Sequence, residues 1–325
     1  MLIPVLAMHI PDGFLSLPVA AVGWLLLIIL IGIALRQTRR QLGERQIPLM
    51  GILAAFVFAA QMINFPVAGG TSGHLLGALL IAVLLGPWAT VLVMTCVIGV
   101  QGLLFQDGGL TALGFNVVNM GIISGFVGYA VYTLVRRGMG RTFRGQWIGA
   151  ALGAWLGVVI ASAACALELA ASGTSPLSIA FPAMVGVHAL IGVGEALITV
   201  AALTFIRRTR PDLLGTTATV AAKGWGWIAA GLLIALAITF ASPLADRNPD
   251  GLDRVATDHG FVSLEQAPPY KLLPNYTVPF IPEAGVTTIA AGIIGVLVVA
   301  GAGYGVARVA GRKADDPAKL PASEG

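Results

Sequence analysis

The sequence predicts an all-α polytopic membrane protein with about nine transmembrane helices. Three observations lead to this fold class. Of the 325 residues, 57% are hydrophobic and only 10% are charged, whereas soluble domains carry about 25% charged residues. Apolar runs close to the roughly 20 residues needed to cross a bilayer recur along the chain. The basic residues fall in short clusters between these runs, as they do in the cytoplasmic loops of membrane proteins.

Nine apolar segments are candidate spans. The third is short enough to be re-entrant, and only the helix-breaking pair Gly86-Pro87 separates it from the fourth. In chain order, the predicted spans are residues 18–35, 48–65, 73–86, 88–105, 112–135, 147–172, 179–206, 225–243 and 285–308.

Charge predicts the orientation of these spans. Basic clusters follow spans one, five, seven and nine, so nine crossings place all four on one face, which the positive-inside rule identifies as cytoplasmic. We therefore expect the N-terminus outside, the C-terminus in the cytoplasm, and all four histidines on the outer side. The clusters are Arg36, Arg39, Arg40 and Arg45; Arg136, Arg137, Arg141 and Arg144; Arg207, Arg208, Arg210 and Lys223; and Arg308, Arg312 and Lys313.

The chain divides near residue 215. Residues 8–210 carry seven predicted helices, and a polar linker at 211–224 follows them. Residues 225–310 carry two helices around a long outer loop, and 311–325 form a polar cytoplasmic tail. Within that loop, the sequence PDGLDRVA predicts a Pro-Asp-Gly turn that leads into one or two helical turns.

The stretch MHIPDGF, which begins at residue 8, is a candidate metal-binding terminus. If the mature chain began at Met8, its free amine, the amide nitrogen of His9 and Nδ1 of His9 could chelate one metal in a plane. A square-planar nitrogen set favours Ni(II) or Cu(II). His74, in GGTSGHLLGALL, is the best candidate for the fourth ligand. The alternative is that His9 is an interfacial or capping residue.

Further polar residues have two interpretations each. His188 precedes Glu195 by two helical turns, so both can share a helix face. An ionisable residue inside a span is a functional hypothesis, and an interhelical polar contact is the alternative. Polar residues beside outer loops can hydrogen-bond the ligating imidazoles or serve ordinary turns. These candidates are Asn64, Ser72, Gln101, Gln106, Asp107 and Asn116.

Two stripes of small residues at four-residue spacing predict close helix contacts, either within the protein or with a membrane partner. The stripes are Gly51, Ala55 and Ala59, and Gly149, Gly153 and Gly157. The chain has no GxxxxGK[ST] phosphate loop and no HExxH or GxSxG motif, so it cannot hydrolyse ATP by the phosphate-loop route.

Three long motifs carry a family resemblance. MHIPDGFLS, NFPVAGGTSGHLLGALL and LLFQDGGLTALGFNVVNM, in this order, resemble the substrate-binding membrane component of nickel/cobalt energy-coupling factor (ECF) transporters, the CbiM/NikM family. NPDGLDRVATDHGF resembles the small NikN component, with Asp253 where its PDGLE motif has Glu. The chain thus resembles a NikM–NikN fusion over residues 8–310.

The resemblance implies a transport component for Ni(II), with Co(II) as the alternative, that has no enzymatic activity of its own and no cofactor beyond the transported ion. It implies Met8, His9 and His74 as metal ligands. The implied partners are a transmembrane coupling subunit (T component), ATPase subunits (A components) and membrane lipid, and no nucleic acid. A membrane metalloenzyme that uses His188 and Glu195 is a remoter alternative.

One departure from the family concerns the start of the chain. The family motif begins at the initiator methionine, whereas here it begins at residue 8. With residues 1–7 attached, Met8 has no free amine. We expect either that translation starts at Met8 or that residues 1–7 are removed, and the first is favoured because the segment does not read as a targeting signal.

Overall fold

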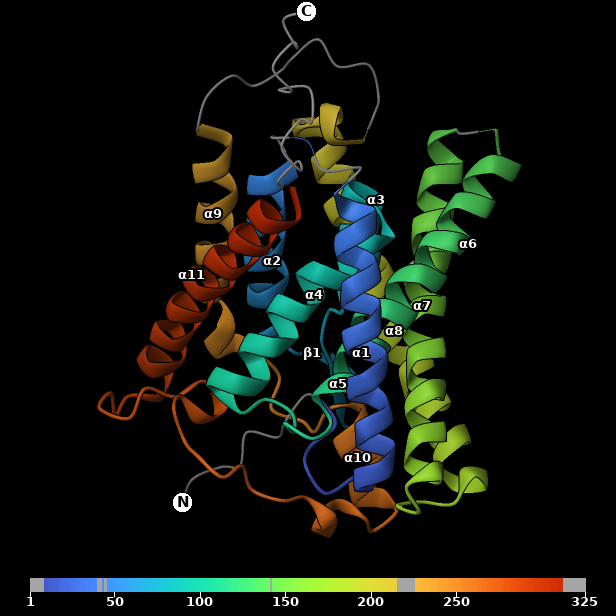
Figure 1. Cartoon of the computed structure of the whole chain (residues 1–325), viewed down its shortest axis with the longest axis vertical. Coiled ribbons are helices and arrows are strands. Elements are labelled where there is room, and N and C mark those ends of the chain that lie inside the picture. The colour runs from blue at the N-terminus through green and yellow to red at the C-terminus, as the bar shows by residue number, and fades with distance from the viewer. Residues whose placement is uncertain (1–8, 40–42, 44–45, 141, 215–225, 312–325) are drawn as a thin grey trace, which may run out of the picture.

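The computed structural model describes residues 9–39, 43, 46–140, 142–214 and 226–311. In this part the fold is helical, with one short two-stranded hairpin added to the expected all-α architecture (Figure 1). The helices are α1 Leu17–Thr38, α2 Gln46–Gln61, α3 Ala78–Leu85, α4 Pro87–Val100, α5 Leu113–Val117, α6 Ser124–Gly138, α7 Phe143–Ala171, α8 Leu177–Thr209, α9 Gly226–Thr239, α10 Gly251–Asp258 and α11 Ala284–Gly311.

Seven described helical segments are long and apolar enough to cross a membrane. They contain α1, α4, the continuous run from α5 to α6, α7, α8, α9 and α11. A π-helical segment, Gln101–Phe105, extends α4, and a second one, Val118–Ile123, joins α5 to α6. At these seven positions the predicted spans are confirmed as helices. The helices at the second and third predicted spans are shorter than those spans: α2 has 16 residues and α3 has 8.

The prediction of a continuous helix over residues 73–86 is wrong. Strands β1 (Phe65–Val67) and β2 (Thr71–Gly73) form an antiparallel hairpin before α3. Gly77, at φ +76°, then precedes the first residue of α3. Irregular backbone at membrane depth is tolerated where protein surrounds it, and all three residues of β2 are buried.

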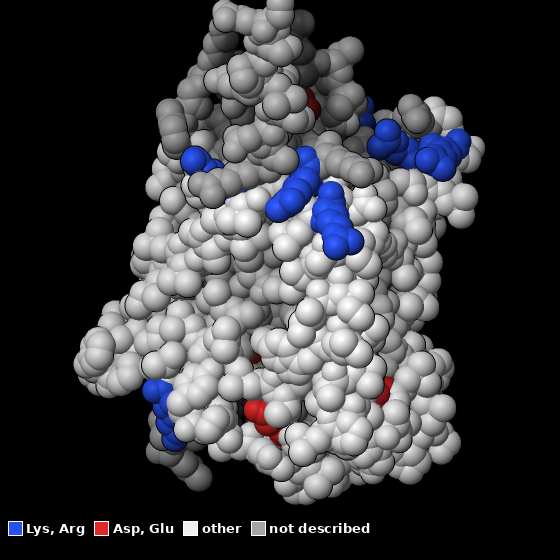
Figure 2. Space-filling view, viewed as in Figure 1, with Lys and Arg blue, Asp and Glu red and all other residues white. Residues whose placement is uncertain are grey.

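The basic residues gather toward one end of the molecule. The C-terminal ends of α1, α6, α8 and α11 lie at the end drawn uppermost in Figure 1, and α10 lies toward the opposite end. Figure 2 shows Lys and Arg side chains concentrated around that upper end. The arginines in the last turns of these helices are Arg36, Arg136, Arg137, Arg207, Arg208 and Arg308.

Both stripes of small residues serve contacts within this chain. A Cβ on Gly51 would lie 2.8 Å from the carbonyl oxygen of Ala300, so α2 packs closely against α11. On α7, a Cβ on Gly149, Gly153 or Gly157 would lie 2.5–2.9 Å from a main-chain oxygen of the α6 helix. The stripe at Gly51 is therefore covered by α11 and is not an open docking surface. The two long helices described after residue 225, α9 and α11, both pack on α2.

Candidate metal centre

Three histidines that are distant in the sequence line one cavity. His9, His74 and His188 surround a volume of about 80 Å³, whose walls come from the N-terminal segment, the hairpin, α5, α7, α8 and α10. A single buried water needs about 10–15 Å³ of cavity volume, so the cavity has room for an ion and a few waters. Further polar lining comes from Asn116, Asn119, Ser162, Cys165 and Asp250.

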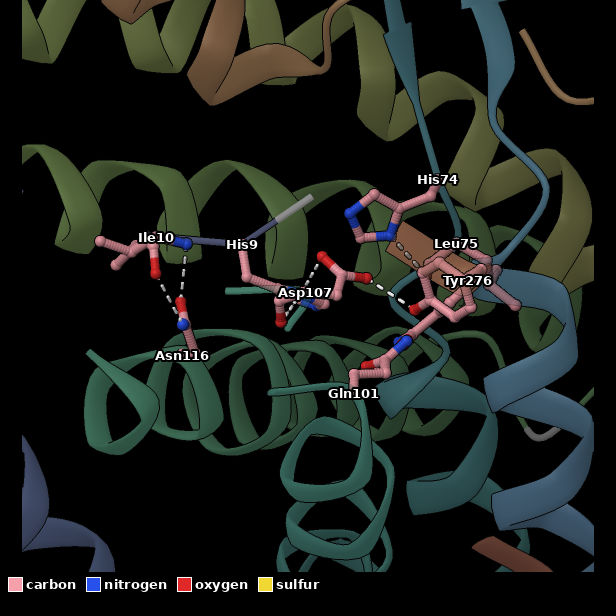
Figure 3. A network of polar contacts seen from close by, with 9 residues as sticks. His9, Ile10, His74, Leu75, Gln101, Asp107, Asn116 and Tyr276 are labelled. Carbon is pink, nitrogen blue, oxygen red and sulfur yellow. Dashed lines mark hydrogen bonds and ion pairs between the residues drawn. The ribbon is translucent and has the colours of Figure 1, made fainter. Parts of the chain in front are cut away.

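The rings of His9 and His74 lie side by side, with centroids 5.8 Å apart and planes inclined at 61° (Figure 3). Two imidazoles that share an ion through nitrogens at about 2.0–2.1 Å have centroids at most about 6.3 Å apart. The pair is therefore close enough to bind one metal. Among the described residues, no three His, Cys, Asp or Glu side chains form a metal-binding group. Met8, whose amine the prediction requires, lies outside the described residues.

His9 is buried, at 2% exposure, and its ring is oriented by Asp107. Nδ1 lies 2.9 Å from Oδ1 of Asp107 and 3.1 Å from its carbonyl oxygen. Burial by itself lowers the pKa of His9, but the charge and hydrogen bonds of Asp107 outweigh it, so the pKa is raised. Nε2 is buried without a hydrogen-bond partner in the described part of the chain. A chelate through Nδ1 therefore requires this nitrogen to leave Asp107.

Asp107 is itself positioned by Tyr276, which the sequence analysis did not identify. The Tyr276 hydroxyl donates to Oδ2 of Asp107 at 2.7 Å (Figure 3). Its ring stacks on Phe105, with ring centroids 4.7 Å apart. Asn275 and Tyr276 both have positive φ, at 52° and 55°, which is uncommon for residues other than glycine. No pattern in the sequence indicates this contact, because Tyr276 stands there only as an aromatic residue in a loop. The Asp107 carboxylate therefore joins the first half of the chain to the second.

The segment after His9 is bound to the loop between α4 and α5. The Asn116 side chain accepts from the Ile10 N–H at 2.9 Å and donates to the Ile10 carbonyl at 3.0 Å. The Asp12 carboxylate accepts the N–H of Thr111 at 2.8 Å. A Cβ on Gly109 would lie 2.2 Å from the Asp12 nitrogen, so this approach requires glycine. These contacts fix the position of His9 relative to the cavity.

We expect Asn116→Ala to destabilise the docked N-terminal segment. The substitution leaves the buried Ile10 N–H without the Asn116 oxygen that accepts from it, whereas the Ile10 carbonyl keeps the hydrogen bond from the Gly109 N–H at 2.9 Å. Each unsatisfied buried group costs about 1–3 kcal/mol. Thermal unfolding of the detergent-purified protein should show a lower midpoint, and limited proteolysis should cut sooner near residue 10. An unchanged midpoint and cleavage rate would contradict this assignment.

His74 follows a strand that is bound to the long loop between α9 and α10. The Ser72 N–H donates to the Pro249 carbonyl at 2.8 Å, and its hydroxyl donates to the Asn248 carbonyl at 2.7 Å. The Asn64 amide donates to the Ser72 hydroxyl at 3.3 Å. Ser72 and Asn64 thus connect the hairpin to the start of the PDGLD motif and the residue before it. The Nδ1 of His74 donates to the carbonyl of Leu75 at 3.0 Å.

The PDGLD motif forms a wall of the cavity. As its sequence predicts, a turn leads into a short helix: Asp250 is the N-cap of α10, and its carboxylate accepts from the Asp253 N–H at 2.9 Å. A Cβ on Gly251 would lie 2.7 Å from Cε1 of His188, so glycine at this position lets α10 pack directly against the His188 ring. Burial raises the pKa of both Asp250 and Asp253. The sequence did not indicate that this motif reaches the histidines.

The remaining predicted residues have structural partners. Nδ1 of His188 donates to the Met184 carbonyl at 2.8 Å. The Gln101 amide donates to the Gln61 side chain at 2.9 Å, and the Gln106 amide donates to carbonyls of the π-helical segment that precedes it. The Glu195 carboxylate binds two main-chain N–H groups immediately after His74. Of the six proposed supporting residues, Asp107 is the one whose contact with a predicted imidazole is resolved here.

Comparisons with known proteins identify the family. Residues 9–213 match the CbiM family, described as a cobalt uptake substrate-specific transmembrane region, and residues 225–312 match the PDGLE domain. A nickel transport protein of NikMN type from Archaeoglobus fulgidus is 37% identical over 93% of this chain and 99% of its own length. The cobalt transport protein CbiM of Sorangium cellulosum is 36% identical over 64% of this chain and 94% of its own length.

A solved structure supports the same assignment. It is described as a truncated transition metal transporter, is 35% identical, and superposes with a TM-score of 0.55 over 62% of this chain and 99% of that chain. The chain therefore belongs to the CbiM family of nickel and cobalt transport proteins and carries a PDGLE domain. With seven long apolar helices among the residues that the structure describes, it is a multi-pass membrane protein.

Proposed function

We propose that this member of the CbiM family is the substrate-binding membrane component of an ATP-driven ECF-type importer of Ni(II). The observation that carries the proposal is the convergence of His9 and His74, at 5.8 Å between ring centroids, on one small cavity. Family membership supplies the transport function, and the two histidines supply imidazole ligands of the type that divalent nickel favours.

The proposed ligand set is the Met8 amine, the amide nitrogen and Nδ1 of His9, and the His74 imidazole. Because Nδ1 of His9 is bound to Asp107 in this structure, binding exchanges the Asp107 contact for the metal. The ion is the cargo, and the proposal includes no further cofactor. Four nitrogen donors in a plane suit Ni(II).

Nickel is preferred to cobalt as the cargo for a second reason. The NikMN-type relative named for nickel matches both halves of this chain, whereas the relative named for cobalt matches 64% of it. The site itself could accept Co(II), which remains the alternative substrate with the same architecture.

The structure weakens the other candidate functions. A metalloenzyme that uses Glu195 would need its carboxylate at the cavity, but both oxygens accept main-chain N–H groups. A permease for a small organic vitamin would need more room, since small-molecule pockets are typically about 300–1,000 Å³, compared with the 80 Å³ found here.

Orientation and partners complete the proposal. The basic ends of α1, α6, α8 and α11 face the cytoplasm, so the N-terminus and the histidine cavity face outward in a chain that crosses nine times. The 16-residue α2 makes a short crossing. The eight-residue α3, at about 12 Å, makes a crossing only together with the irregular segment before it. A coupling subunit and ATPase subunits would supply the energy. Residues 8–210 would form the metal-binding component, and 225–310 the NikN-like component.

Metal titration of purified protein with a verified N-terminus at Met8 tests the function. We expect saturable Ni(II) binding with one ion per chain, an absorption spectrum typical of planar nitrogen coordination, and weaker binding of Co(II). The absence of saturable binding of either ion would refute the proposal. Tighter binding of Co(II) than of Ni(II) would assign the protein to the cobalt branch instead.

A further inference from the structure

Glu195 is a buried carboxylate in the middle of α8 with a specific main-chain partner. It is 2% exposed. Its Oε2 accepts from the Leu76 N–H at 2.6 Å, and its Oε1 accepts from the Gly77 N–H at 3.0 Å. Both oxygens are therefore bound to the irregular segment between His74 and the start of α3.

These bonds act on the peptide unit that orients His74. The Leu76 N–H belongs to the same planar peptide group as the Leu75 carbonyl, and that carbonyl accepts from Nδ1 of His74 at 3.0 Å (Figure 3). A contact that fixes the N–H of this group fixes the direction of its C=O. Glu195 thereby acts on the imidazole through a single rigid unit.

The next peptide unit is fixed in the same way. Its N–H, on Gly77, donates to Glu195, and its C=O, on Leu76, accepts from Nε2 of Gln61 at 2.9 Å. Two successive peptide planes are thus bound by side chains from α8 and α2. These bonds do not serve as an ordinary helix cap, because a cap binds N–H groups inside the first turn. The N–H groups of Leu76 and Gly77 instead precede the first residue of α3.

We propose that Glu195 is a positioning residue for the metal site: by fixing the Leu75–Leu76 peptide plane, it selects the His74 tautomer that carries its proton on Nδ1 and its lone pair on Nε2. A carbonyl at one ring nitrogen sets which nitrogen can bind a metal, and such outer partners tune metal affinity. The inference rests on the proposed function only in taking His74 as a ligand.

Glu195→Gln is the test. Glutamine keeps the side-chain length but places an NH₂ group where one carboxylate oxygen accepted an N–H. We expect Ni(II) affinity to fall by about 10–100-fold. In metal-free protein with ¹⁵N-labelled histidine, the His74 signal, assigned with a His74→Gln sample, should change from the Nδ1–H tautomer to a mixture of tautomers. A purely structural role would lower the unfolding midpoint without changing the tautomer.

Glu168→Gln is the matched control, because Glu168 is also a buried carboxylate in a membrane helix and accepts from the side chain of Asn119 at 2.8 Å. It should leave the His74 tautomer unchanged. If Glu195→Gln fails to fold, Glu195→Asp, which keeps both oxygens on a shorter side chain, should show the same change of tautomer.

The outcomes separate the two proposals. Wild-type tautomer and wild-type affinity in the folded Glu195 variant would overturn the positioning role while the proposed function stands. Wild-type protein that binds no metal would overturn the proposed function, whereas the tautomer comparison, which needs no metal, would still decide the role of Glu195.

Discussion

Replacing His74 by alanine is expected to abolish measurable Ni(II) binding while the protein still folds and inserts. His74 is the imidazole whose ring lies 5.8 Å from that of His9, and its strand and the following peptide units are fixed by contacts that do not involve its own ring. Loss of a residue that hydrogen-bonds a metal ligand typically lowers metal affinity by about 10–100-fold. Loss of a direct ligand should therefore lower the affinity by more than about 100-fold. The same loss is expected for His9→Ala.

His259→Ala provides the control for this experiment. His259 follows α10 on the same side of the molecule, and its side chain is exposed, so this variant should titrate as wild type does. Isothermal titration of the three variants, with thermal unfolding of the metal-free proteins alongside, separates ligand loss from misfolding. A folded His74→Ala protein that still bound Ni(II) as tightly as wild type would exclude His74 from the site.

Much of the fold could be predicted because a bilayer imposes a simple pattern. The runs that became α7, α8 and α11 have the length and hydropathy that a crossing requires. The third segment was misjudged because its composition is equally apolar, while Gly73 and Gly77 allow a strand and a left-handed turn that hydropathy does not register. What decides such a segment is the protein that surrounds it.

The candidate site was predictable where a residue type by itself carries chemistry. His9, His74 and Asp107 stood out as polar residues in motifs of an apolar chain, although His9 could also have been a capping residue and Asp107 an ordinary turn residue. Tyr276 and Asp250 could not be found in this way, because their relevance depends on the packing of the second half of the chain against the first. That packing places the Tyr276 hydroxyl on Asp107 and the PDGLD wall against His188.

The start of the chain should have the other large effect on binding. Protein that begins at Met8 is expected to bind Ni(II) more than about 100-fold more tightly than protein that retains residues 1–7. Loss of a residue that hydrogen-bonds a metal ligand costs about 10–100-fold in affinity, and loss of a ligand should cost at least as much. In the longer protein the Met8 nitrogen is part of a peptide bond, so it can bind a metal only after losing its amide proton, as the His9 amide nitrogen must, whereas a free amine offers its lone pair directly. His9 and His74 are the same in both proteins, so the comparison isolates the amine.

The experiment uses the two proteins purified in parallel, with each N-terminus verified by mass spectrometry. Acetylation of the Met8 amine in the shorter protein is the control, because it adds no residues and removes the same nitrogen from coordination. We expect the acetylated protein to bind as weakly as the longer one. Equal, tight binding by all three would exclude the amine and point to a site built on the two imidazoles, with Nε2 of His9, which is buried without a hydrogen-bond partner among the described residues, as the ring ligand.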